Sequence, residues 1–405
     1  MSKKSTFLSS CILISLILVV IFFTSCTDET ISSNIPQQKE TNTYEELDYS
    51  DKIELFNYPS FGSTNTNFKF NVILKDTSLK ISKIKYDFSN DFEYDTTLTT
   101  LDTVKTKFKL FGYNTIIGSV ELEDKSVLSC STVVWLTEPV VISSNNNVFF
   151  EPNIYNGQII SVTNGPGHTA QLIDINTFDM NCYFCGFTSD NFNEMHCSIP
   201  SFDGNKLLFD NGTDYKFCYY DFIKNDSTIT DIPIRVLSYP IGQITWSLDS
   251  ETIYYVFLDD NYLLNGIKSY NLESNQITSL YNSGNYICIV PDKKEQLAIL
   301  EKISDSKSKL IIYNTTTNSI EKEYYDIPFD APFRMLRDSD RIYFDGELAF
   351  YSLSREKAFY MQFDELNLSE HMYGEADINM DGNKFVIGTW DANRALYYIV
   401  LPNFF

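Results

Sequence analysis

Three histidines are the side chains best suited to metal or acid–base chemistry in this 405-residue sequence. His168, His196 and His371 lie in segments between apolar runs, and Trp390 and Arg394 lie in another such segment. Neutral imidazole is the commonest metal ligand and exchanges a proton near pH 7. A fold that brings these five residues to one mouth would make a ligand-binding site. Ordinary surface or hydrogen-bonded histidines are nevertheless the interpretation that the sequence favours.

Two further patterns are weaker metal candidates. Cys182 and Cys185 are expected on one strand, where residues three apart point to opposite faces, so a shared zinc ion is disfavoured. Residues 377–382 match the opening half of a calcium loop, but Gly388 stands where the closing bidentate acid is needed. We therefore predict no metal site and no cofactor beyond a covalent lipid.

Catalytic motifs are also missing from the sequence. It contains no Gly-x-Ser-x-Gly elbow, phosphate-binding glycine loop or His-Glu-x-x-His pair. Acidic pairs such as Asp259-Asp260 could serve glycoside hydrolysis, but in an acidic chain such carboxylates are more often solvating. We predict a protein that is not an enzyme.

An internal repeat positions all of these residues. Turn signals between short apolar strands recur every 43 to 47 residues, at Asn156-Gly157, Asp203-Gly204, Asp249-Ser250, Asp292-Lys293, Asp338-Ser339 and Asp381-Gly382. Asp-Gly turns suit tight hairpins, because both central positions favour positive φ. Four strands per repeat and six repeats predict a six-bladed β-propeller over residues 138–405. The last repeat ends at a third strand, residues 395–401, so we expect residues 139–143 to supply its fourth strand and close the ring.

These repeats resemble the TolB-like, WD40-like propeller family. Residues 246–249 (Trp-Ser-Leu-Asp) and 201–204 (Ser-Phe-Asp-Gly) match its hallmark best, and the repeat around Asp338 matches it least. In that architecture His168, His196 and His371 fall in loops of one face, in or between neighbouring blades. The resemblance covers about 260 residues and implies the architecture rather than a particular ligand.

Residues 46–137 precede the repeats and alternate between apolar and polar residues, as in residues 67–72 and 119–123. This alternation is typical of half-buried antiparallel strands. The segment resembles PKD-type immunoglobulin-like domains through residues 86–88 (Tyr-Asp-Phe), 111–113 (Phe-Gly-Tyr) and 120–124. We expect an Ig/PKD-like β-sandwich that acts as a spacer, and the whole fold to be all-β.

The first 45 residues look like an export signal and a tether. Two lysines precede an apolar run of about 12 residues, which is short for a membrane-spanning helix, and Thr-Ser-Cys26 follows it. This pattern resembles a lipobox, which implies a signal peptide at residues 1–26 and a covalent lipid on Cys26. Residues 27–45 are polar and predict a flexible tether. Acidic residues behind Cys26 resemble the surface-export signal of Bacteroidota lipoproteins, so we expect outer-membrane attachment at the cell surface, with the periplasmic face as the alternative.

The net charge of the chain narrows the choice of partners, and the remaining cysteines and three short motifs can be interpreted more simply. A net charge of −23 disfavours nucleic acid, because no basic stripe is present to neutralise phosphates. Cysteines 130, 182, 185, 197, 218 and 288 show no disulfide spacing and are expected mainly as buried small residues. Residues 95–97, 102–104 and 226–228 resemble the short O-glycosylation motif of exported Bacteroidota proteins.

The function that we expect is non-enzymatic binding or scaffolding. The propeller mouth would present a glycan or protein ligand site, with a role accessory to glycan uptake that the combination of PKD-like and propeller modules implies. One alternative is a propeller-type glycan lyase that uses the histidines, with or without a metal. Another is a TolB-like periplasmic component of the cell envelope.

Overall fold

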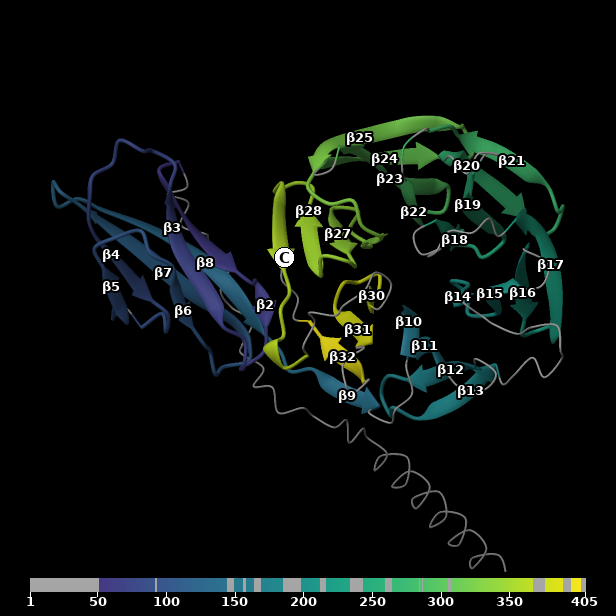
Figure 1. The fold of residues 1–405 in the computed structure, drawn as a ribbon, viewed down its shortest axis with the longest axis horizontal. Helices are drawn as coiled ribbons and strands as arrows, with labels where there is room; N and C mark the ends of the chain where they lie inside the picture. The colour runs from purple at the N-terminus through teal and green to yellow at the C-terminus, as the bar shows by residue number, and fades with distance from the viewer. Residues whose placement is uncertain are drawn as a thin grey trace, which may run out of the picture. The chain divides into compact units, whose positions relative to one another are not determined.

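The computed structural model shows an all-β protein, apart from the 3-10 turn η1 (Asp364–Leu366) among the described residues (Figure 1). The structure describes residues 51–401 except 92, 144–148, 156–157, 164–168, 185–197, 212–215, 234–242, 259–263, 284, 286, 305–306, 367–375 and 389–394. Within this described part, no helix has the length and apolar character needed to cross a membrane.

Two mainly antiparallel sheets built from residues 53–136 pack face to face. The first contains β1 (Ile53–Tyr58), β3 (Phe68–Leu74) and β6 (Val104–Thr106) in that order. The second has the order β2 (Phe61–Gly62), β8 (Val127–Leu136), β7 (Gly112–Leu122), β4 (Ile81–Asp87) and β5 (Thr96–Leu98), with β2 parallel to β8. Phe68, Phe70 and Val72 are buried between them, and the residues that alternate with these three are more exposed. The predicted half-buried strands are confirmed here.

Six four-stranded antiparallel sheets follow in the described part of the chain, and we number them one to six. Sheets one to three contain β10 (Phe149–Tyr155), β11 (Gln158–Thr163), β12 (Thr169–Asp174) and β13 (Met180–Phe184); β14 (Ser198–Pro200), β15 (Lys206–Asn211), β16 (Lys216–Asp221) and β17 (Asp226–Pro233); and β18 (Ile244–Trp246), β19 (Thr252–Leu258), β20 (Leu264–Asn271) and β21 (Ile277–Tyr281). Sheets four to six contain β22 (Ile287–Pro291), β23 (Gln296–Ser304), β24 (Lys307–Asn314) and β25 (Ser319–Ile327); β26 (Phe333–Met335), β27 (Arg341–Phe344), β28 (Ala349–Ser352) and β29 (Lys357–Tyr360); and β30 (Ala376–Ile378), β31 (Lys384–Gly388), β32 (Leu396–Val400) and β9 (Val140–Ser143).

The first strands of consecutive sheets contact one another in a closed cycle, which is the arrangement of a β-propeller. β10 contacts β14, β18 contacts β22, and β22 contacts β26. Trp246 Nε1 donates to the carbonyl of Ile199, which joins β18 to β14 at 2.9 Å. An ion pair joins β26 to β30, and β10 contacts β30 and β31. Each sheet thereby covers apolar faces that it could not bury alone.

The sixth sheet is completed by a strand from the opposite end of this region, as the sequence predicts. β9 pairs antiparallel with β32, with Val140 opposite Tyr398 and Val141 opposite Tyr397 (Figure 1). Without β9, β32 would be an edge strand with unpaired backbone groups facing away from β31. The pairing joins the two ends of the propeller, so residues 140–143 belong to the same sheet as residues 376–400.

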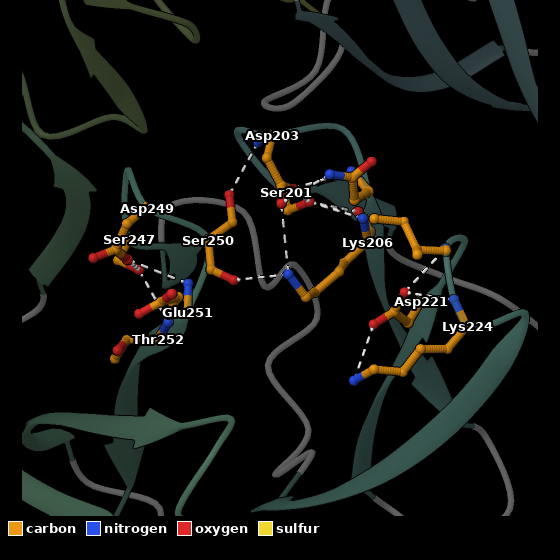
Figure 2. Close-up of polar contacts among 12 residues, drawn as sticks. Ser201, Asp203, Lys206, Asp221, Lys224, Ser247, Asp249, Ser250, Glu251 and Thr252 are labelled. Carbon is orange, nitrogen blue, oxygen red and sulfur yellow. Dashed lines mark hydrogen bonds and ion pairs between the residues drawn. The ribbon is translucent and has the colours of Figure 1, made fainter.

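The turns between the first and second strands of sheets two and three share a serine–aspartate arrangement (Figure 2). Ser201 Oγ donates to Asp203 Oδ1 at 2.6 Å and accepts the backbone N–H of Lys206 at 2.9 Å. The next sheet repeats this geometry, since Ser247 Oγ donates to Asp249 Oδ1 at 2.6 Å. Ser250 and Ser339 have positive φ, as do Gly204 and Gly382 at the matching turns. The turn around Asp338, the poorest match in sequence, forms as well.

The same turns also bind neighbouring sheets to each other. Ser250 Oγ accepts the backbone N–H of Asp203 at 3.0 Å, and its carbonyl accepts Lys206 Nζ at 3.2 Å (Figure 2). Two sheets further on, Ser339 Oγ donates to Asp292 Oδ1 at 3.0 Å. Polar residues of the repeat motif therefore have a structural role in joining neighbouring sheets.

The sandwich and the propeller belong to one compact unit, and β2 connects them. Phe61 pairs with Met361, and its ring stacks on Trp135 at 4.9 Å between centroids. The backbone N–H of Ser60 donates to the carbonyl of Tyr360 at 2.8 Å. Phe61 is fully buried in the apolar cluster of sheets five and six, so the sandwich is packed against the propeller rather than only tethered to it.

Candidate functional site

The site residues predicted from sequence all lie outside the described residues. These are Cys26, His168, His196, His371, Trp390 and Arg394. Asp259, Asp260, Cys185 and Cys197 lie outside as well, while Cys182 falls on β13, the outermost strand of sheet one, as expected. The clustering of the histidines and the lipid site therefore stay predictions.

Three of the expected buried cysteines are described, and the prediction holds for them. Cys130, Cys218 and Cys288 are all buried. Burial raises the pKa of Cys130 to about 12, so this thiol stays protonated and unreactive at neutral pH.

A cavity of about 230 Å³ lies at the centre of the propeller, at the end where the serine–aspartate turns are found. Its apolar wall comes from the first strands and turns of sheets one to three and includes Ile154, Ile199 and Trp246. Its charged wall comes from sheets five and six. That wall contains Arg334, Arg337, Asp377, Asp381 and Lys384.

The ion pair of Arg334 and Asp377 is the main polar feature of this cavity. Arg334 Nε donates to Asp377 Oδ1 at 2.8 Å, and the backbone N–H of Ile154 donates to Asp377 Oδ2 at 3.0 Å. The Asp377 side chain is 8% exposed, whereas the Arg334 side chain is 38% exposed. The pair thus links sheets five, six and one, and its arginine faces the more accessible side.

A second, smaller cavity of about 30 Å³ shares Arg334 and Asp377 with the first. Tyr343 and Asp345 line it, and the Tyr343 hydroxyl donates to Asp345 Oδ1 at 3.4 Å. Burial, followed by the carboxylates of Asp345 and Asp377, raises the pKa of Tyr343 well above its ordinary value. Tyr343 is therefore a hydrogen-bond donor here and not a source of negative charge.

The larger cavity is suited to binding an anionic or polar group. Arg337 Nε lies 3.0 Å from Asp381 Oδ1 in a second, more exposed pair, and Lys384 adds a third cation. Asp345 lines the neighbouring cavity beside Arg334, so that guanidinium faces two carboxylates and would share its five N–H donors between them and a ligand. The described lining contains no histidine, serine or cysteine.

Residues 377–382, which resemble part of a calcium loop, use their acidic side chains for other contacts in the structure. Asp377 is engaged by Arg334 and Ile154, and Asp381 by Arg337. The described residues contain no group of three metal-ligating side chains. In this structure the acidic residues of the motif serve ion pairs.

Sequence reasoning missed Arg334 and Asp377, although the repeat contained a signal. Strand pairing makes them equivalent to Ile199, Thr245 and Val290 in the first strands of sheets two, three and four. Two adjacent repeats therefore replace uncharged residues with opposite charges at one position. An alignment of the repeats position by position would have shown this.

No known protein-family model matches the chain, and no curated protein matches it in sequence. Among solved structures, an auxiliary nutrient binding protein from Bacteroides thetaiotaomicron is similar at a TM-score of 0.42 and 11% identity, covering 88% of this chain and 99% of that one. A protein of unknown function from the same species gives 0.38 and 11% over the same shares. The β-propeller domain of the Trilobed protease from Pyrococcus furiosus gives 0.39 and 13%, over 64% of this chain and 82% of its own. The propeller arrangement itself follows from the strand pairing of this chain.

Proposed function

We propose that this protein is a non-enzymatic binding lipoprotein whose central propeller cavity holds a carboxylate-bearing group of a glycan or protein ligand. The observation that supports this most is the Arg334–Asp377 pair, because it places a partly exposed arginine side chain in the wall of a cavity of about 230 Å³. The three cations of the cavity wall outnumber its two carboxylates, Asp377 and Asp381, in a chain of net charge −23. Such a site selects an anionic group against the repulsion of the surrounding surface.

The proposal includes the full architecture predicted from sequence. The six sheets would be the blades of a TolB-like propeller over residues 138–405, and the paired sheets at residues 46–137 an Ig/PKD-like domain. A lipid on Cys26 and the tether at residues 27–45 would attach both to the outer membrane, facing the cell surface. A role accessory to glycan uptake fits a binding site of this kind, with no metal, cofactor or nucleic acid involved.

Titration of the full-length protein with trigalacturonate, a uronic acid trimer, tests the binding proposal. The variant Arg334→Met/Asp377→Asn removes both charges together, which avoids leaving one of them unpaired. We expect the native protein to bind and the double variant to bind at least about tenfold more weakly, the equivalent of one lost charged contact. Lys224→Met is the control, since Lys224 pairs with Asp221 in the turn between β16 and β17, which does not line this cavity. Equal binding by the double variant and the native protein would contradict the proposal.

A further inference from the structure

A third cavity lies between sheets three and four and has a different chemical character from the two central ones. It encloses about 410 Å³, within the range typical of small-molecule sites. One wall is a face of sheet three, and the other is formed by two turns of sheet four. Its lining residues are Asp249, Thr252, Tyr254, Ser269, Asn271, Ser274, Gln276, Thr278, Leu280, Lys294, Glu295, Thr315 and Thr316. We call it the lateral groove.

A single small residue explains why this groove is open. Ser269 on β20 pairs with Tyr254, and the equivalent third-strand positions of sheets two, four, five and six are Tyr219, Ile312, Phe350 and Tyr398. Those four side chains are at most 8% exposed and fill the space against the next sheet. Serine leaves that space empty in sheet three alone of these five.

Uncharged hydrogen-bonding groups dominate the lining. Cross-strand pairing places Ser269 beside Thr278 and Thr252 beside Asn271, so hydroxyls and amides form rows along one face. Asp249, Lys294 and Glu295 at the rim leave a net charge of −1, and Figure 2 shows Asp249 and Thr252 on the same turn. Hydroxyls both donate and accept hydrogen bonds, as do amides through their two ends.

Two lining residues are held in place by the protein. Asn271 Oδ1 accepts both the backbone N–H and the hydroxyl of Ser274 at 2.9 Å. Tyr254 shares a side-chain hydrogen bond with Thr315 across the two sheets. Binding would not need to order these two side chains, which lowers its entropic cost.

We propose that the lateral groove binds a neutral oligosaccharide, at a site separate from the central cavity. A sugar presents closely spaced hydroxyls that donate and accept, and the rows of hydroxyls and amides offer partners for both. An anionic ligand is disfavoured by Asp249 and Glu295 and by the overall charge. An apolar ligand would leave the polar lining desolvated without partners.

Titration of the full-length protein with maltotriose, cellotriose, xylotriose and mannotriose tests this proposal, with trigalacturonate as the charged comparison. Ser269→Tyr fills the groove with the residue that sheet two uses at the same position, and Ser227→Tyr adds the same side chain at an exposed position of β17. We expect at least one neutral trimer to bind, at least about tenfold less tightly to Ser269→Tyr and unchanged to Ser227→Tyr. If Ser269→Tyr lacks a cooperative melting transition, Thr278→Val decides, with an expected loss of about fivefold for one neutral hydrogen bond.

This experiment distinguishes a failure of the lateral-groove proposal from a failure of the central-cavity proposal. Neutral-trimer binding that survives in Arg334→Met/Asp377→Asn and is lost in Ser269→Tyr supports the lateral groove, whatever trigalacturonate does. Binding of none of the neutral trimers, or equal binding by the native protein and the deciding variant, overturns it. Neutral-trimer binding that is lost only in the Arg334→Met/Asp377→Asn variant also overturns it and assigns that ligand to the central cavity.

Discussion

The gap between sheets two and three and the gap between sheets three and four share one strand arrangement but have different contents. In the first, the Tyr219 ring meets Trp246 edge to face at 6.3 Å, and both are buried. In the second, Ser269 occupies the place of Tyr219, and a polar groove of about 410 Å³ remains. The backbone of a repeat therefore tolerates a filled or a hollow gap, and one third-strand residue decides which.

Tyr219→Ser should have the largest effect on stability. It places in the gap between sheets two and three the residue found at the same position in the gap between sheets three and four. Removing a buried aromatic ring loses its burial and leaves a cavity, and we expect a loss of about 3–5 kcal/mol in the free energy of unfolding. Urea denaturation of the full-length protein measures it. Ser269→Tyr is the reciprocal variant and should raise the free energy by about 0.5–2 kcal/mol. Similar losses in both variants would show that the third-strand residue does not control the gap.

Part of the fold could be predicted from the sequence, because the repeat spacing depends on local turn chemistry. Asp203-Gly204 and Asp381-Gly382 marked turns, and the early end of the last repeat indicated that residues 139–143 close it. Contacts between sheets depend on which face each residue occupies and on what lies opposite. Arg334 with Asp377 and the open space at Ser269 are contacts of that kind, so single-strand patterns did not show them.

The predicted histidine site is a second case in which a strand pattern does not specify contacts in space. The strand pattern put His168 in the segment between β11 and β12, which agrees with the strands on either side. Whether His196 and His371 approach it depends on loop conformation, which a pattern of apolar strands does not specify.

Arg334→Met should have the next largest effect on stability. It concerns the central cavity, in contrast to the variants at the gaps between sheets. It leaves the Asp377 carboxylate buried without its guanidinium, so we expect a loss of about 2–3 kcal/mol, below the cost of breaking a fully buried pair because Arg334 is 38% exposed. Adding Asp377→Asn should restore most of that stability. Thermal unfolding of the single and double variants measures this, and a double variant as unstable as the single one would contradict the charge argument.

The smallest expected effect concerns the other end of the gap between sheets three and four, where charges fill the space. Glu301 on β23 lies 3.1 Å from Lys309, and Ser283 donates to its carboxylate. Burial alone would raise the pKa of Glu301, but hydrogen bonds from Ser283 and Lys309 outweigh it and lower the pKa below the ordinary 4.5. The stabilisation is therefore complete above about pH 4.5 and is lost as the pH falls through the lowered value.

Glu301→Gln tests this pH dependence. We expect a loss of about 1–2 kcal/mol at pH 7 and a flatter fall in stability below pH 4.5 than in the native protein. Unfolding curves at pH 7, 5, 4 and 3 compare the two proteins. An acid limb as steep in Glu301→Gln as in the native protein would assign the acid sensitivity to other carboxylates.

A crystal structure of the full-length protein with the tightest-binding neutral trimer tests most directly whether the hollow gap is a binding site. The account predicts sugar density between sheets three and four, with hydroxyls within hydrogen-bond distance of Ser269, Thr278 and Asn271. Density for the trimer elsewhere, with only ordered water beside Ser269, would contradict it.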